Sequence, residues 1–80
     1  MTFEKTARIA SAREIAIYRK NPTAHKAKGI RLVREQGNWL IINLNKFVSQ
    51  DFWKAWRTQR AEVKAAGYSV AKAFDHWVVY

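Results

Sequence analysis

The eighty-residue chain contains no cysteine, and these two facts together most restrict how it can fold. A domain of this size buries only about 60% of the surface of its unfolded chain, and small domains often add disulfides or a zinc site for that reason. Without cysteine, stability must come from large apolar side chains. Four tryptophans and four phenylalanines are present, each able to bury on the order of 150–250 Å². With an apolar fraction of 49%, we expect one compact domain over residues 1–80.

The clearest local signal is a β-hairpin in the middle of the chain. Residues 30–34 and 39–44 are rich in β-branched and aromatic side chains, as strands are. Between them lies Gln36-Gly37-Asn38, in which Gly37 adopts a positive φ at little cost. The pattern therefore predicts two antiparallel strands.

The second half of the chain predicts a long helix followed by a second hairpin. Ser49 is a good N-cap and Gly67 a good residue to end a helix, so we expect a helix over residues 50–66. Its apolar face should pack on the sheet and comprises Phe52, Trp56, Gln59, Val63 and Ala66. Residues 69–74 and 77–80 read as two short strands that turn at Asp75-His76.

The N-terminal part of the chain admits two interpretations. Residues 3–12 favour a short alanine-rich helix, and residues 14–19 alternate like a strand. A single helix from Glu4 to Lys20 is the alternative. Residues 20–29 are predicted to be a flexible basic loop, because Asn21-Pro22 interrupts regular structure. The resulting order, (α)βββαββ, predicts an α+β fold in which one long helix packs on an antiparallel sheet.

Charge is the strongest functional signal in the sequence. Fifteen lysines and arginines against six acidic residues give a formal net charge of +9. This excess favours an anionic partner, which we expect to be nucleic acid, a nucleoprotein complex or an acidic surface of a host protein. The absence of cysteine is typical of a reducing compartment, either a bacterial cytoplasm or a nucleus, and we expect the cytoplasm of a bacterial host cell.

Two groups of residues are candidates for binding such a partner. On the predicted helix, the spacing i, i+4, i+7, i+11 gathers Trp53, Arg57, Arg60 and Lys64. The alternative interpretation of this helical stripe is a solvated helix face with no binding role, whose tryptophan covers the edge of the core. The second group combines the basic loop with the first hairpin strand and comprises Lys26, Lys28, Arg31 and Arg34. The alternative interpretation of this second group is a mobile loop that only keeps the protein in solution.

Aromatic stacking on single-stranded bases is a third possibility. The side chains that could serve it are Trp39, Trp77, Tyr18, Tyr68 and Tyr80. We expect most of these rings to build the core instead, because so small a domain needs them there.

Catalysis finds little support in the sequence. The six acidic residues are scattered without a paired spacing, and two histidines without cysteine make a poor metal site. We therefore expect no enzyme activity, no metal and no cofactor. No apolar run approaches the ~20 residues of a membrane span. The long helix uses its apolar face on the sheet and has none left for lipid, so we expect no membrane binding. We also expect the chain to be a monomer.

In size, lack of cysteine and lack of catalytic motifs, the chain resembles small phage-encoded inhibitors of the anti-CRISPR kind. This resemblance implies a non-catalytic binding protein encoded by a phage or mobile element. Many such inhibitors are acidic and imitate DNA, which a net charge of +9 argues against. Two functions follow as hypotheses: a nucleic-acid-binding module, or an inhibitor that binds a host defence nucleoprotein complex directly, with Trp53 as its anchor.

Overall fold

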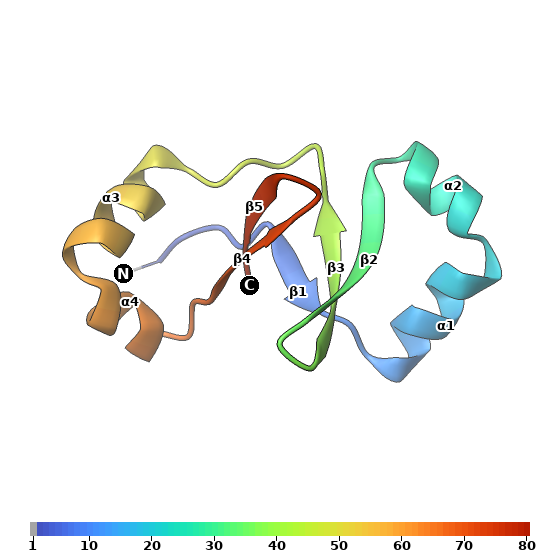
Figure 1. Cartoon of the computed structure of the whole chain (residues 1–80), viewed down its shortest axis with the longest axis horizontal. Coiled ribbons are helices and arrows are strands. Elements are labelled where there is room, and N and C mark those ends of the chain that lie inside the picture. The colour runs from blue at the N-terminus through green and yellow to red at the C-terminus, as the bar shows by residue number, and fades with distance from the viewer. Residues whose placement is uncertain (1) are drawn as a thin grey trace.

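The computed structural model describes residues 2–80 and has the order βααββααββ (Figure 1). The elements are β1 (Ala7–Ile9), α1 (Ala12–Lys20), α2 (Pro22–Ala27), β2 (Ile30–Glu35), β3 (Asn38–Asn43), α3 (Gln50–Thr58), α4 (Arg60–Ala65), β4 (Val70–Ala73) and β5 (His76–Val79). Helices and antiparallel strands in one small domain confirm the predicted α+β class.

The elements form four layers along the long axis of a molecule measuring 41 × 22 × 19 Å. One three-stranded antiparallel sheet has the order β1-β3-β2, and the β4–β5 hairpin makes a second sheet. Helices α1 and α2 lie at one end beside the three-stranded sheet, and α3 and α4 lie at the other end beside the hairpin (Figure 1). The single predicted sheet is therefore two sheets packed together.

Two apolar cores join these layers. Between the two sheets, Leu40 and Ile42 of β3 are fully buried against Val78 of β5. Between the hairpin and the C-terminal helices, Phe52 of α3 is 1% exposed and packs with the buried Val63, Tyr68 and Val79. Because side chains alternate along a strand, β5 supplies Val78 to one core and Val79 to the other.

Both predicted hairpins are confirmed, with a small shift in the second. In the first turn Gln36 and Gly37 have φ of 50° and 81°, so both central residues take the positive φ of a type I′ turn. In the second, Phe74 and Asp75 have φ of 52° and 56°, so the turn lies one residue earlier than Asp75-His76.

Both interpretations of the N-terminal segment are wrong, because a strand comes first and a helix follows. Ala7–Ile9 pairs with β3, and the helix begins only at Ala12. The cause is a capping box: the Glu14 amide donates to the Ser11 hydroxyl (3.2 Å), and the Ser11 amide donates to the Glu14 carboxylate (3.3 Å). Residues 14–19, whose alternating side chains favour a strand, are part of helix α1.

The prediction of a flexible loop over residues 20–29 is also wrong, because Pro22–Ala27 is helical. The side chain of Asn21 accepts a hydrogen bond from the Ala24 amide (3.4 Å), and Pro22 occupies the first turn, where it needs no donor. The same Asn-Pro pair that ends α1 therefore starts α2.

The predicted helix over residues 50–66 has the expected ends but is not continuous. The Ser49 hydroxyl accepts a hydrogen bond from the Phe52 amide (3.1 Å), and Gly67 has a φ of +97°. Gln59 leaves the helical region, with φ −136° and ψ 42°, and separates α3 from α4. As a result Gln59 and Ala66, predicted on the apolar face, are exposed.

Candidate functional site

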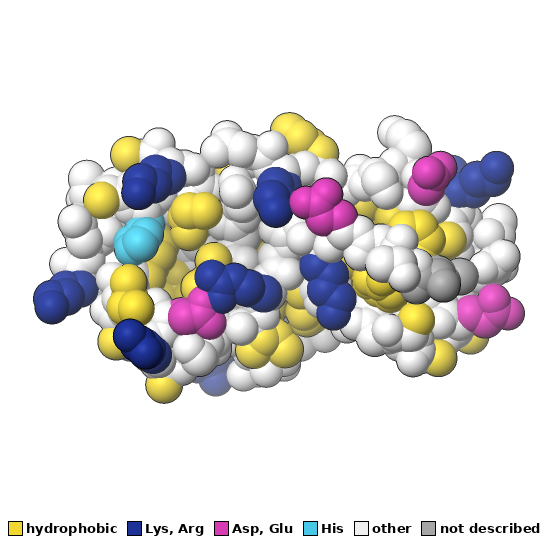
Figure 2. All heavy atoms as spheres, turned by 180° about the vertical axis from the view of Figure 1, so that it is seen from behind, with side chains coloured by type: hydrophobic (Ala, Val, Ile, Leu, Met, Phe, Trp, Pro, Cys, Tyr) yellow, Lys and Arg dark blue, Asp and Glu magenta, His cyan; other side chains and the backbone are white. Residues whose placement is uncertain are grey.

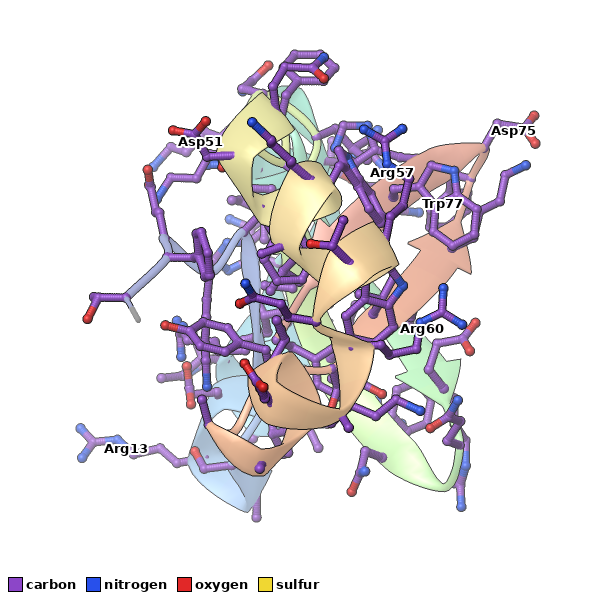
Figure 3. The ribbon with its side chains drawn as sticks, turned by 90° about the vertical axis from the view of Figure 1, so that its left-hand side faces the viewer. Arg13, Asp51, Arg57, Arg60, Asp75 and Trp77 are labelled. Atoms are coloured by element: carbon purple, nitrogen blue, oxygen red, sulfur yellow. The ribbon has the colours of Figure 1, made fainter. Side chains whose placement is uncertain are left out.

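Three tryptophans and four cations gather where α3 and α4 meet the β4–β5 hairpin. We call this surface the tryptophan patch; it comprises Trp53, Trp56, Arg57, Arg60, Lys64, Lys72 and Trp77. Figure 3 shows Arg57, Arg60 and Trp77 on the same side of the C-terminal helices. The predicted helical stripe of Trp53, Arg57, Arg60 and Lys64 thus forms part of a larger surface that includes the hairpin.

The hairpin places Trp77 and Lys72 side by side. They are direct cross-strand partners in the register of β4 and β5, so both side chains project from the same face of the hairpin. The Lys72 ammonium lies 5.6 Å from the centre of the Trp77 ring. Trp53 meets that ring edge-on, with centroids 5.8 Å apart and planes at 80°. Trp77 remains 49% exposed, so its ring is accessible to a ligand.

The second part of the tryptophan patch is built around Trp56. Its ring stacks on the buried Phe52 ring, with centroids 5.8 Å apart and planes at 22°, which fixes its position. The Arg60 guanidinium lies 5.0 Å and the Lys64 ammonium 5.7 Å from the Trp56 ring centre. Such cation–π contacts contribute about 0.5–1 kcal/mol at exposed sites, enough to orient both cations.

No acidic side chain neutralises these four cations within residues 2–80. The ion pairs present there are Arg8–Glu14 and Lys46–Glu4, and neither involves the tryptophan patch. Figure 3 shows Asp51 on the opposite side of α3 from Trp77, and Asp75 projecting outward at the hairpin tip. The patch is therefore a concentrated positive charge with an accessible aromatic ring.

The other predicted group does not join this surface. Lys26 and Lys28 lie in and just after α2, which Figure 1 places at the opposite end of the molecule from α3 and α4. The Arg31 guanidinium donates hydrogen bonds to the main-chain oxygens of Lys26 (2.9 Å) and Ile30 (3.0 Å), so it holds the end of α2 against β2. Arg31 therefore has a structural role in the fold.

Arg34 occupies a separate position on the three-stranded sheet. Its guanidinium lies 5.6 Å from the Trp39 ring centre, and Arg19 of α1 approaches the same ring at 5.3 Å. The cations on the back of the molecule are dispersed between polar and apolar side chains rather than joined (Figure 2). The eight predicted binding residues thus divide between distant regions. The helical four lie in the tryptophan patch, Lys26, Lys28 and Arg31 lie around the end of α2, and Arg34 lies beside Trp39.

Sequence reasoning misses Trp56 and Lys72 as members of the tryptophan patch and does not connect Trp77 with the helical stripe. It assigns Trp56 to the apolar face, gives Lys72 no role and offers Trp77 only for stacking. The register of the second hairpin contains the signal, because a two-residue turn at Phe74-Asp75 sets Lys72 opposite Trp77. Of the other aromatic candidates, Tyr18, Tyr68 and Tyr80 are buried, as expected for core residues, and Trp39 is half-buried.

Comparison with models of protein families, with curated proteins and with solved structures finds no match to this chain. In the part of the chain that the structure describes, no three histidine or acidic side chains are grouped so that they could hold a metal ion. None of the helices found there has the length and apolar character to cross a membrane.

Proposed function

We propose that the chain is a non-catalytic protein that binds single-stranded nucleic acid through the tryptophan patch. The observation that carries this proposal is an accessible Trp77 ring among four cations that have no acidic partner within residues 2–80. Cations release the counterions of phosphates, and an exposed indole stacks on an unpaired base. The two requirements of strand binding are met on one surface.

A single strand fits this surface better than a duplex. Bases in a duplex are stacked on each other, so an indole reaches their faces only when the strand is unpaired or distorted. Helices α3 and α4 have only nine and six residues and are separated by the break at Gln59, so neither presents a long continuous face to a groove. The indole and the cations lie together on the surface instead, as on a stacking platform.

The proposal predicts salt-dependent binding that prefers single strands. Four cations against four phosphates of a single strand give a slope of log Kd against log salt of about 3 in magnitude, at ~0.7 per phosphate. We expect a fluorescein-labelled oligonucleotide to bind by anisotropy at low salt, with quenching of tryptophan emission, and the matching duplex to bind more weakly. Affinity that does not change with salt, or a preference for the duplex, would contradict the proposal.

A second candidate function is direct binding to a protein of a host nucleoprotein complex, as a phage-encoded inhibitor of the anti-CRISPR kind acting in the bacterial cytoplasm. It is favoured by Phe47 and Phe74, which are 77% and 64% exposed. The Phe47 ring packs beside His76, the neighbour of Trp77 in β5, with ring centroids 5.1 Å apart. Exposed aromatic side chains are enriched in protein interfaces.

The two functions differ in their response to nuclease. A protein partner captured from host lysate by the wild-type chain should survive nuclease digestion and be lost when Phe47 and Phe74 are both replaced by serine. Loss of every partner on digestion would leave strand binding as the function.

A further inference from the structure

The face of the three-stranded sheet that is turned away from the cores is only half covered. The strand register places on it Arg8, Ile30, Leu32, Arg34, Trp39, Ile41 and Asn43. None of these side chains is buried, whereas Leu40 and Ile42 on the inner face are 0% exposed. Helix α1 lies over part of this face, yet its Ile17 remains 50% exposed. Apolar surface is therefore left open between α1 and the sheet.

Two adjoining hollows occupy this opening and differ in character. One, of about 260 Å³, is lined by Lys5, Thr6, Asn43 and Lys46. The other, of about 270 Å³, is lined by Ile17, Tyr18, His25 and Glu14. They share Arg8, Ile30 and Ile41 as common walls. Figure 2 shows this side of the molecule, with apolar side chains in a depression beside a histidine and cations around it.

The size of the combined site fits a small ligand. Pockets that bind small molecules measure about 300–1,000 Å³, and each hollow alone falls just short of this range. Because they adjoin through three shared residues, together they lie within it. A ligand that fills both needs a polar end for the first hollow and an apolar body for the second.

The charges around the polar hollow favour a ligand with one negative charge. Three cations line this hollow. Lys46 pairs with Glu4 (3.2 Å) and Arg8 with Glu14, while the Lys5 ammonium has no ion-pair partner within residues 2–80 and lies 5.5 Å from the Tyr68 ring centre. The excess is a single positive charge. Arg8 and Lys46 each keep donors that these pairs do not use, since a guanidinium has five and an ammonium three.

The apolar hollow favours an aliphatic body over a nucleotide base. Its aliphatic walls are Ile17, Ile30 and Ile41, and the Arg8–Glu14 ion pair lies at its border with the polar hollow. The two aromatic rings, Tyr18 and His25, already stack on each other, with centroids 5.3 Å apart and planes at 16°. We infer that the paired hollows bind a medium-chain aliphatic carboxylate, with its carboxylate near Lys46 and Arg8 and its chain between α1 and the sheet. This site is separate from the tryptophan patch and does not depend on strand binding.

The inference is tested by titrating the ¹⁵N-labelled chain with decanoate below its micelle concentration and following amide shifts. We expect saturable shifts in the residues that line the two hollows. Decylamine has the same body but the opposite charge, and acetate has the carboxylate alone, so both should leave these amides unshifted. Shifts confined to other surfaces, equal shifts with decylamine, or tighter binding of adenosine monophosphate than of decanoate would overturn the inference.

Two matched variants locate the ligand. Ile17→Glu places a carboxylate in the apolar wall and should weaken decanoate binding by about tenfold or more. Ile9→Glu makes the same change at a residue of similar exposure, 57%, that lines neither hollow, and should bind like the wild type. Because both side chains are half exposed, both variants should fold. Equal affinity in the two variants would overturn the site.

Discussion

Replacing Phe52 by alanine should destabilise the chain far more than the same change at an exposed aromatic residue. Its ring is 1% exposed and lies within about 6 Å of the rings of Phe3, Trp53, Trp56 and Tyr68. Burial of this kind makes Phe→Ala cost about 3–5 kcal/mol. Domains are stable by only about 5–15 kcal/mol, and a domain of this size falls toward the lower end, so a large part of the margin disappears. Thermal unfolding followed by circular dichroism should show Tm lowered by about 12 °C or more.

Phe47→Ala is the matched control for this prediction. Phe47 is 77% exposed, so the same chemical change there should alter the free energy of unfolding by no more than about 0.5 kcal/mol. If Phe52→Ala unfolded at the temperature of Phe47→Ala, the second core would not hold α3 and α4 on the hairpin.

Replacing Trp77 by alanine should have the largest effect on strand binding. Stacking of one base on an aromatic side chain contributes about 1–3 kcal/mol, so affinity for a single-stranded oligonucleotide should fall about 5- to 150-fold. The loss should appear mainly in affinity and not in the salt slope, because no charge is removed. Anisotropy titrations at several salt concentrations measure both quantities together.

Two companion variants separate stacking from a general disturbance of the hairpin. Trp77→Phe retains an aromatic ring and should recover much of the lost affinity. Phe74→Ala removes an exposed ring from the same hairpin, outside the tryptophan patch, and should bind as the wild type does. If all three variants bound the strand equally well, Trp77 would not be part of the binding surface.

The two hairpins and both ends of the long helical segment can be predicted because their signals are local. Gly37 and Gly67 take positive φ, and Ser49 caps the first turn of α3, each through its own neighbours. The break at Gln59 cannot be predicted in this way. No proline or glycine marks it, and Gln59 makes no side-chain capping bond to α4.

The N-terminal segment departs from its prediction because burial and capping outweigh alanine content. Ala7 is a good helix former, yet it is 6% exposed in the core between the sheets and pairs with Ile42 of β3. Such tertiary burial overrides intrinsic propensity. The Ser11-x-x-Glu14 pattern is the local signal in the sequence that marks the start of α1.

The candidate site is partly predictable. Helical spacing brings Trp53, Arg57, Arg60 and Lys64 together, and the structure keeps them on one surface. Lys72 and Trp77 join them only through the packing of the hairpin on α3, a long-range contact that spacing along the chain does not reveal. Of the basic residues predicted in the N-terminal half, the fold keeps Lys26, Lys28 and Arg31 around the end of α2 and places Arg34 beside Trp39.

The most direct test of the tryptophan patch compares two variants with the same net charge. One replaces Arg57, Arg60, Lys64 and Lys72 by glutamine; the other replaces Arg13, Lys20, Lys26 and Lys28, which are exposed on or beside α1 and α2. Each removes four positive charges from a chain of formal charge +9. The salt slope for a single-stranded oligonucleotide should fall from about 3 to near zero in the first variant and stay near the wild-type value in the second. Equal losses in both variants would show that the overall charge, and not the tryptophan patch, holds the strand.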